Sequence, residues 1–332
     1  MKSITKPILV SGIQPTGRLH LGNYLGALKN FVDLQNSGKY GCYFFIADLH
    51  SLTEEFNPKE KPRQILELTA DYIAVGLDPK KSEIFLQSLI PAHSELAWIL
   101  NTLTPMGELE RMTQFKDKGR AQQENINAGL FTYPTLMAAD ILLYGAQFVP
   151  VGNDQDQHLE LARTLARKFN GRFGKTFIEP KPLHTETPRV MSLKNPEKKM
   201  SKSDPASCLF LDDSPEEIRA KIKTAVTDSG SDIKYDPKNK AAVSNLLKIY
   251  SSLADKPIEK LEKEFSGKTY SEFKTKLAET IVKHFADYRK KKKTLLEKPT
   301  LLRQTLRQGS GRAAKIAARK ISEVKKRMGI AI

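Results

Sequence analysis

Short apolar runs alternate with amphipathic stretches through the first half of the chain, the pattern of a parallel sheet covered by helices. Four runs predict strands, at residues 8–10, 42–47, 84–86 and 148–151. After the first run, apolar residues recur at helical spacing, at Leu21, Leu25, Leu28 and Val32. Asn57, Pro58 and Glu60 predict the start of another helix, with an N-cap, a first-turn proline and an acidic residue.

The strand pattern fades after about Ser192, and helical patterns replace it. Ser214 and Glu217 form a capping box with a proline between them, and further helices are predicted at residues 241–254, 270–296 and 312–328. We therefore predict an α/β fold. Residues 1–192 form a Rossmann-like parallel sheet with flanking helices, and residues 193–332 form an all-helical second domain.

Positive charge is concentrated at the carboxyl end. The 332 residues carry a net charge of +16, and residues 283–332 hold 16 Lys/Arg against three acidic residues. The remaining residues therefore carry only +3. A local field of this kind suits a polyanion such as nucleic acid. A solvated basic helix without a partner is the alternative interpretation.

The cysteines and the apolar runs bear on location. Cys42 lies in an apolar run typical of core packing, and with only Cys208 besides it there is no disulfide framework. An apolar strand begins by Ile8, which leaves no room for a leader segment, and no run reaches the length of a membrane span. These features predict a cytoplasmic protein without membrane association.

The turn after the first predicted strand carries glycines and polar side chains, at Gly12, Gly17, Gly22, Gln14, Thr16, His20 and Asn23. In an open parallel sheet, ligands bind at the carboxyl ends of the strands, where this turn lies. The spacing matches neither the dinucleotide-binding fingerprint nor a P-loop. A phosphate-binding turn and a purely structural turn both fit this segment.

A second polar segment concentrates positive charge between Pro196 and Pro205. Lys198, Lys199 and Lys202 lie within five residues, beside two serines. Clustered ammonium groups repel one another, and a polyphosphate would relieve that repulsion and be stabilised by them. A solvated, lysine-rich linker is the alternative.

Residues 152–158 follow a strand and open a helix. Asn153 or Asp154 is expected to cap this helix, with backbone N–H groups facing a ligand. Asp154 and His158 are spaced like metal ligands, but no third ligand accompanies them. We therefore predict no protein-held metal.

These motifs resemble a known family. His20-Leu-Gly-Asn23 is similar to the first signature of class I aminoacyl-tRNA synthetases, and Lys199-Met-Ser-Lys-Ser203 matches the second residue for residue. Residues 11–17, 107–115, 137–144 and 149–152 narrow the resemblance to the tryptophanyl-tRNA synthetases of bacterial type. It extends over essentially the whole chain. The resemblance implies a ligase that activates L-tryptophan with ATP and transfers it to tRNA(Trp).

The apolar stretch from Pro134 to Tyr144 supports a tryptophan pocket. Tyr133, Met137 and Asp140 fall on one helix face. Indole has one N–H donor and no acceptor, so a carboxylate beside a thioether and an aromatic ring suits it. A salt-bridged or capping aspartate is the alternative that the spacing leaves open. In the resembled family the matching aspartate binds the indole N–H, with Gln155 and His50 near the substrate.

The resemblance also implies an ATP site. Its predicted residues are Gln14, Pro15, Thr16, His20, Gly22, Asn23, Gly152, Asn153, Asp154, Val190, Lys199, Met200, Ser201, Lys202 and Ser203. Lys118, in a loop over ATP, is expected to join Gln14, Lys199 and Lys202 as catalytic residues. Mg²⁺ is expected to be carried by the phosphates. The chain departs from the family at Asn153, usually Glu, and at Val10, often Phe.

The resemblance further implies a homodimer in which the helical second domain recognises the anticodon. The basic carboxyl-terminal helices of that domain are expected either to contact the RNA backbone or to dock on the catalytic half. Three alternatives remain at this point: a tyrosyl-tRNA synthetase, a nucleotidyltransferase without an RNA partner, and an RNA-binding relative with an inactive site. A tyrosine pocket needs partners for a hydroxyl that both donates and accepts, which the single Asp140 fits less well than indole.

Overall fold

The computed structural model describes residues 6–113, 127–152, 155–184 and 189–331. Over these residues the chain forms a parallel sheet with strand order β3-β2-β1-β4-β5, which confirms the predicted α/β class. The strands are β1 (Ile8–Ile13), β2 (Gly41–Ile46), β3 (Ser82–Leu86), β4 (Phe148–Val151) and β5 (Lys181–His184). The sequence pattern missed β5 because it is a half-exposed edge strand that contains Pro182.

Helices cover both faces of the sheet. Successive strand residues point to opposite faces, so Leu9 and Phe44 join one apolar cluster while Val10 and Phe45 join the other. The first face is covered by α1 (Leu21–Asn23), the π-helical η1 (Tyr24–Leu28), α2 (Lys29–Asn36) and α3 (Lys61–Ala74). The second is covered by α4 (Ala92–Asn101), α7 (Ala128–Leu142) and α8 (Asp156–Phe173).

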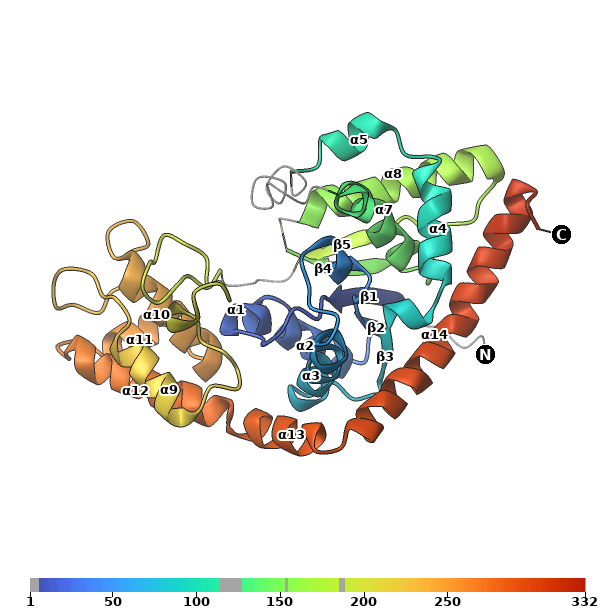
Figure 1. Cartoon of the computed structure of the whole chain (residues 1–332). Helices are drawn as coiled ribbons and strands as arrows, with labels where there is room; N and C mark the ends of the chain where they lie inside the picture. Colours follow the sequence, from blue (N-terminus) through green and yellow to red (C-terminus); the bar gives the residue numbers. More distant parts are fainter. Residues whose placement is uncertain (1–5, 114–126, 153–154, 185–188, 332) are drawn as a thin grey trace.

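The remaining helices divide into a group and a band. The group contains α9 (Pro215–Lys223), α10 (Ala241–Ala254), α11 (Ile258–Glu264) and α12 (Tyr270–His284). The band contains α13 (Ala286–Leu296) and α14 (Pro299–Met328), which run from that group along the outside of the sheet (Figure 1). The division at residue 192 remains a prediction, although α14 lies beyond it in sequence and packs on the sheet.

Three helix starts test the local predictions. The Ser214 capping box is present at the start of α9. The predicted N-cap at Asn57 is wrong, because Asn57 accepts a hydrogen bond from the Lys59 backbone within a turn and α3 begins only at Lys61. The last helix begins at Pro299 rather than near 312, since proline is tolerated in a first turn.

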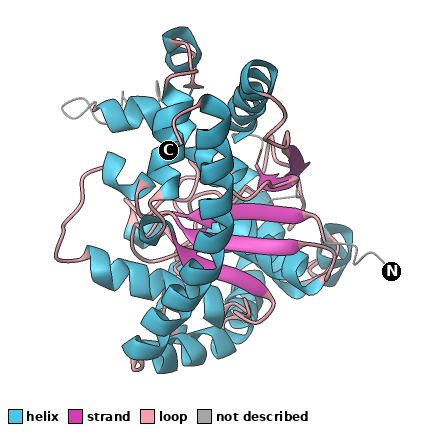
Figure 2. Cartoon of the chain, turned by 90° about the vertical axis from the view of Figure 1, so that its right-hand side faces the viewer, coloured by secondary structure: helices cyan, strands magenta, loops and turns pink. Residues whose placement is uncertain are grey.

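Helix α14 crosses the edge of the sheet at very short range. At Gly309 a Cβ atom would lie 1.9 Å from the carbonyl oxygen of Ile84, so only glycine fits there. The neighbouring Ser310 hydroxyl accepts a hydrogen bond from the backbone N–H of Leu86 at 3.1 Å. Figure 2 turns this side toward the viewer and shows a helix running across the strands. The basic carboxyl-terminal helix is thus anchored to β3.

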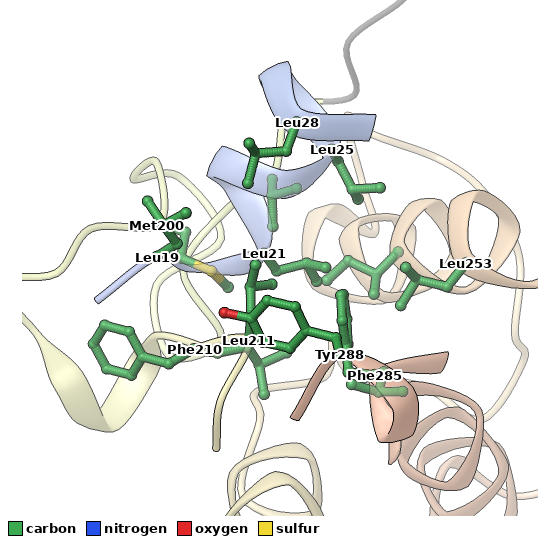
Figure 3. Packing of buried hydrophobic residues seen from close by; sticks show 14 of the residues in the cluster. Leu19, Leu21, Leu25, Leu28, Met200, Phe210, Leu211, Leu253, Phe285 and Tyr288 are labelled. Atoms are coloured by element: carbon green, nitrogen blue, oxygen red, sulfur yellow. The ribbon is translucent and has the colours of Figure 1, made fainter. Parts of the chain in front are cut away.

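One apolar cluster joins the sheet to the helical group. Leu19 and Leu21 precede and open α1, and they pack with Met200, Leu211 and Tyr288 from the second half of the chain (Figure 3). Residues 19 to 21 also pair in antiparallel fashion with the segment 209 to 211 through backbone hydrogen bonds. The glycine-bearing turn after β1 and the lysine-bearing segment between Pro196 and Pro205 are therefore held beside each other. Among the described residues, no helix has the length and apolar character to cross a membrane.

Candidate active site

A cavity of about 400 Å³ opens at the carboxyl ends of β1 and β4. It collects predicted residues from distant parts of the sequence, namely Gln14, His50, Tyr133, Met137, Asp140, Gly152, Gln155 and Lys199. Tyr133, Met137 and Asp140 line it together, as their spacing along α7 predicted. Its apolar wall includes Val10 and Phe45. The cavity therefore has an apolar end with one carboxylate and an end that reaches a lysine.

Asp140 is 1% exposed, and three side chains of the described part of the chain donate hydrogen bonds to it. Its Oδ1 accepts from His93 Nδ1 at 2.6 Å and from Gln87 Nε2 at 2.8 Å. Its Oδ2 accepts from His50 Nε2 at 2.8 Å. Each carboxylate oxygen has two lone pairs, so the donors of the described residues fill Oδ1 and leave one acceptor position on Oδ2. A donor that enters the cavity can occupy that position.

The same contacts keep Asp140 ionised. Burial alone would raise the pKa of the Asp140 carboxyl, but the hydrogen bonds from His50 and His93 outweigh it and lower the pKa below its ordinary value. His93 is itself fixed, because its Nε2 lies 2.8 Å from the Tyr144 hydroxyl. With Nδ1 donating to Asp140, Nε2 accepts from that hydroxyl. The acceptor is thus negative, rigid and in place without a ligand.

His20 is fixed at the start of α1. The imidazole Nδ1 of His20 accepts from the Gly22 backbone N–H at 3.0 Å. The backbone N–H of His20 donates to Asn23 Oδ1 at 3.0 Å. A Cβ at position 22 would lie 2.8 Å from the imidazole, so glycine gives the ring its place. Burial, then the positive charges of Lys202 and Lys199, lower the pKa of His20 to about 4. At neutral pH the proton therefore sits on Nε2, where it can donate to an anion.

The loop that carries Lys199–Ser203, the signature loop, lies beside the turn that follows β1, the first turn. Lys202 reaches across from the signature loop to the first turn. Its Nζ donates to Thr16 Oγ1 at 3.1 Å and to the carbonyl oxygens of Thr16 and Gly17 at 3.4 Å each. Among the described residues no carboxylate lies within ion-pair distance of it, and burial lowers the pKa of its ammonium group. A partly buried ammonium held only by neutral oxygens gains strongly from an anion.

The other predicted residues have varied positions. Val190 and Met200 are buried, and the Met200 N–H donates to the Val190 carbonyl, so their side chains belong to the core. The hydroxyls of Ser201 and Ser203 lie 2.9 Å apart on the exposed side of the loop. Pro15 is buried directly before the turn.

Three predicted residues, Lys118, Asn153 and Asp154, lie outside the described residues. The expected cap of the helix after β4, Asn153 or Asp154, therefore remains a prediction, and the described part of that helix, α8, begins at Asp156. Gln155, directly before α8, lies on the cavity wall.

The sequence did not single out three side chains that this site contains. Gln87 and His93 support Asp140, and Lys61 Nζ donates to Ser51 Oγ at 2.8 Å and to the Pro15 carbonyl at 3.4 Å beside the first turn. Gln87 directly follows β3, which is a signal available in the sequence. His93 and Lys61 offered none, because each acts through a partner far away in the chain.

A partly buried ion network ties the first turn to the helical band. Arg18 donates to Asp212 at 2.8 Å and to Asp213 at 2.9 Å. Lys292 of α13 bridges Asp212, at 2.9 Å, and Asp71 of α3, at 2.7 Å. Lys292 is only 5% exposed. Residues from four separate segments thus fix the backbone next to Thr16 and Gly17.

The fold and the site agree with the comparison to known proteins. A family model described as class I tRNA synthetases (W and Y) matches residues 2–286, so the chain belongs to this family. Its similar relatives include the tryptophan–tRNA ligases of Caldanaerobacter subterraneus subsp. tengcongensis, 47% identical over 96% of this chain and 97% of that protein, and of Bacillus subtilis, 46% identical over 98% of each.

Solved structures give the same picture. The tryptophanyl-tRNA synthetase from Mycoplasma pneumoniae has a TM-score of 0.89 at 36% identity and covers 98% of this chain and 99% of its own. The enzyme from Campylobacter jejuni, complexed with ADP and tryptophan, has a TM-score of 0.83 at 37% identity, over 97% and 99% of the two chains. A tyrosyl-tRNA synthetase from Aeropyrum pernix shares the fold, with a TM-score of 0.68 at 19% identity, 92% of this chain and 90% of its own.

Proposed function

We propose that the chain is a tryptophan–tRNA ligase, which forms tryptophanyl-adenylate from L-tryptophan and ATP and then charges tRNA(Trp). One observation carries the proposal: Asp140 presents a single free acceptor position in an apolar cavity that also reaches Lys199. The relatives at 45–47% identity are tryptophan–tRNA ligases, which favours this reading over a tyrosyl enzyme, a nucleotidyltransferase or an inactive RNA binder.

The apolar end of the cavity binds tryptophan. The indole N–H donates to Asp140 Oδ2, and the ring packs against Met137, Tyr133 and the wall formed by Val10 and Phe45. His50 lines the same end and holds Asp140 from the side. A smaller side chain at Val10 than the aromatic residue frequent in relatives leaves room near β1. Gln155 contacts the amino-acid part of the substrate.

The first turn and the signature loop bind ATP. The donors are His20 Nε2–H, the backbone at Gly22, and the polar side chains of Gln14, Thr16 and Asn23. Gly152 and the two residues after it contact the ribose. The backbone of the signature loop, which includes Val190, Met200, Ser201 and Ser203, closes over the nucleotide. The described residues at the turn offer cations and neutral oxygens rather than carboxylates, so Mg²⁺ arrives with ATP on phosphate oxygens.

The reaction needs no covalent intermediate with the protein. A carboxylate oxygen of tryptophan attacks the α-phosphorus in line, and the bond from that phosphorus to the bridging oxygen breaks as pyrophosphate leaves. Lys199, Lys202 and Lys118 stabilise the charge that develops on the leaving group, while Gln14 positions the reactants. The 2′-hydroxyl of the terminal adenosine of tRNA(Trp) then attacks the activated carbonyl and releases AMP.

The proposal includes a homodimer in the cytoplasm, with the helical group recognising the anticodon. Leu89, Trp98 and Met106 are 48%, 71% and 62% exposed; they lie shortly before α4, within α4, and at the start of α5 (Met106–Glu110). Such large exposed apolar side chains mark an interface. Both cysteines are buried and unpaired, which suits a reducing compartment.

Pyrophosphate exchange tests the proposal. Purified protein is incubated with ATP, labelled pyrophosphate and each of the twenty amino acids in turn. We expect exchange with tryptophan to exceed exchange with tyrosine or phenylalanine by on the order of 10³-fold or more, because a site that binds a polar group rejects analogues lacking it. Exchange that depends on tyrosine would refute the assignment. Exchange without any subsequent charging of tRNA(Trp) would reduce the chain to an adenylating enzyme.

A further inference from the structure

Helix α14 presents two faces with opposite character. Its buried residues, among them Leu302, Leu306, Ala313 and Val324, dock on the catalytic half. The opposite face carries Arg307, Lys315, Arg319 and Lys326, which are all exposed. At about 100° per residue these four side chains fall within about a third of the helix circumference. We call them the outer basic face.

The outer basic face lacks compensating charge. No acidic residue occurs between Glu297 and Glu323. Two other cations of the helix do have partners, since Arg312 pairs with Glu83 at 2.7 Å and the half-buried Lys325 pairs with Glu95 at 3.1 Å. In the part of the chain that the structure describes, no carboxylate lies within ion-pair distance of any of the four side chains. Their mutual repulsion is therefore relieved only by an external anion.

The positive surface continues beyond this helix. Lys290, Lys291 and Lys293 are exposed on α13, and Lys298 lies exposed at the joint between the two helices. In Figure 1 the two helices form one outer band that begins beside the α9–α12 group and ends past the sheet. From Arg307 to Lys326 the rise of an α-helix spans about 28 Å. A flat, extended array of this length suits a polyanion rather than a small phosphate ligand.

The composition of the face favours RNA backbone over other anions. Between the cations stand Gln304, Gln308, Gly311 and Ser322, which are exposed, small or hydrogen-bonding, and none is a large apolar residue. Membrane-binding helices need an apolar face free to enter lipid, but the apolar face of α14 is already buried on the sheet. Arginine, lysine, glutamine and serine are the side chains that contact phosphate and sugar in nucleic-acid complexes.

We propose that the outer basic face of α14, extended by the lysines of α13, is a sequence-independent docking surface for the sugar–phosphate backbone of tRNA. The inference rests on the proposed function, because it takes tRNA as the substrate. It adds a contact surface outside the active-site cavity, since none of its residues lines that cavity. The surface increases affinity for tRNA, whereas the choice of tRNA falls to base contacts elsewhere.

The test is a full-length triple variant, Arg307→Gln, Lys315→Gln and Arg319→Gln. Its KM for tRNA in aminoacylation at about 0.1 M salt is expected to rise about 10- to 100-fold. The slope of log affinity against log salt should fall by about 2 to 3 units, or somewhat less than one unit for each phosphate contact. Tryptophan-dependent pyrophosphate exchange should stay within about twofold, because the adenylation site is untouched.

Two further variants serve as controls. Lys6→Gln, Lys39→Gln and Lys168→Gln together remove the same charge from exposed positions elsewhere and should leave the KM for tRNA within about threefold. A second triple variant, Arg307→Lys, Lys315→Arg and Arg319→Lys, retains the positive charge and should have the tRNA affinity of the parent protein. Thermal unfolding of all variants confirms that they fold, since the substituted side chains are exposed.

The outcomes separate this inference from the proposed function. If the unmodified protein shows no tryptophan-dependent exchange, the proposed function fails. If it does, and the neutral triple variant keeps the tRNA KM and salt slope of the parent protein, the docking surface is wrong. The surface is also wrong if that variant charges tRNA normally but loses binding to phosphatidylserine vesicles, since the face then serves an anionic membrane. A similar rise in the KM for tRNA in the Lys6, Lys39 and Lys168 variant would also contradict the docking surface, because the rise would then depend only on the total charge of the protein.

Discussion

The two ends of the cavity solve different problems. At the apolar end, Asp140 is almost fully buried and three donors hold it before any ligand arrives. At the polar end, the exposed Lys199 lines the cavity, and Lys202 of the same loop contacts only neutral oxygens among the described residues. The first end is complete apart from one acceptor position, whereas the second lacks its counter-charge. In the proposed reaction, the folded protein therefore already holds the group that selects the amino acid, and the substrate supplies the charge that balances the lysines.

This difference follows from electrostatics. A buried carboxylate without donors would become protonated, so an anionic selector must be hydrogen-bonded permanently. A cation that stabilises a developing charge acts best when no protein anion competes for it. The comparison predicts that substitutions at the two ends will alter different kinetic constants.

Asp140→Asn should have the largest effect. The amide keeps the shape of the side chain but removes the charge and replaces one acceptor oxygen with a donor. We expect kcat/KM for tryptophan in pyrophosphate exchange to fall on the order of 10³-fold, while the KM for ATP changes by less than about threefold. Steady-state kinetics with each substrate varied in turn measures both constants. Equal losses for tryptophan and ATP would erase the proposed division between the two ends.

Lys202→Ala is expected to act on the rate. Loss of a cation that stabilises the leaving pyrophosphate should lower kcat about 10²-fold and leave the KM for tryptophan nearly unchanged. Lys198→Ala is the matched control, because Lys198 is an exposed lysine in the same loop whose side chain, among the described residues, makes no hydrogen bond to the first turn. Single-turnover formation of the adenylate isolates the chemical step. An unaltered rate would remove Lys202 from the mechanism.

His93→Ala and Tyr144→Phe test how far the rigidity of the apolar end matters. His93→Ala removes a donor to Asp140 and should raise the KM for tryptophan about 10-fold, whereas Tyr144→Phe removes only the more distant hydroxyl and should raise it about twofold to threefold. The KM for ATP and the dependence of kcat on ATP should not change. Tyr144 holds His93, and His93 in turn holds Asp140. A larger effect of Tyr144→Phe than of His93→Ala would contradict this order of the hydrogen bonds.

The smallest expected effect concerns the protonation of His20. Burial and the charges of Lys202 and Lys199 hold its pKa at about 4, below the value of 6.5 for a free imidazole. A bound ATP analogue cancels the lysine charges, so the pKa of His20 should rise on binding. NMR titration of the imidazole Cε1–H with and without a non-hydrolysable analogue measures this shift. If the pKa of His20 does not change when the analogue binds, Lys199 and Lys202 do not bind the phosphates.

The same group affects stability. Between pH 4 and 6.5 the unfolded chain binds a proton at this imidazole that the folded chain does not. The stability that neutral His20 contributes is therefore present in full above pH 6.5 and is lost as the pH falls toward 4. His20→Asn keeps a capping acceptor and should flatten this part of the pH profile of unfolding.

Local patterns in the sequence were sufficient for much of the fold. Alternation and apolar runs located β1, β2, β3 and β4, and the helical period put Tyr133, Met137 and Asp140 on one face. These features depend on residues a few positions apart, which is the range over which propensity and periodicity act.

What the sequence did not reveal depends on distance along the chain. The hydrogen bond from His93 to Asp140 joins residues 47 positions apart, and the bond from Tyr288 to Asp71 joins residues 217 apart. Neither His93 nor Lys292 belongs to a local motif, so their roles follow only from the fold. The π-helical turn at Tyr24–Leu28 also escaped prediction, since it alters hydrogen bonding within an otherwise regular apolar spacing.

The crossing of α14 over β3 has a consequence for solubility. A strand at the margin of a sheet offers unpaired backbone groups to any extended chain that meets it. Here α14 covers the edge strand β3, because the Ser310 hydroxyl accepts from the Leu86 N–H and Gly309 packs directly on the Ile84 carbonyl. Removal of the final helix would leave β3 open to intermolecular strand pairing. The thirty residues from Pro299 to Met328 therefore act as a built-in guard against aggregation.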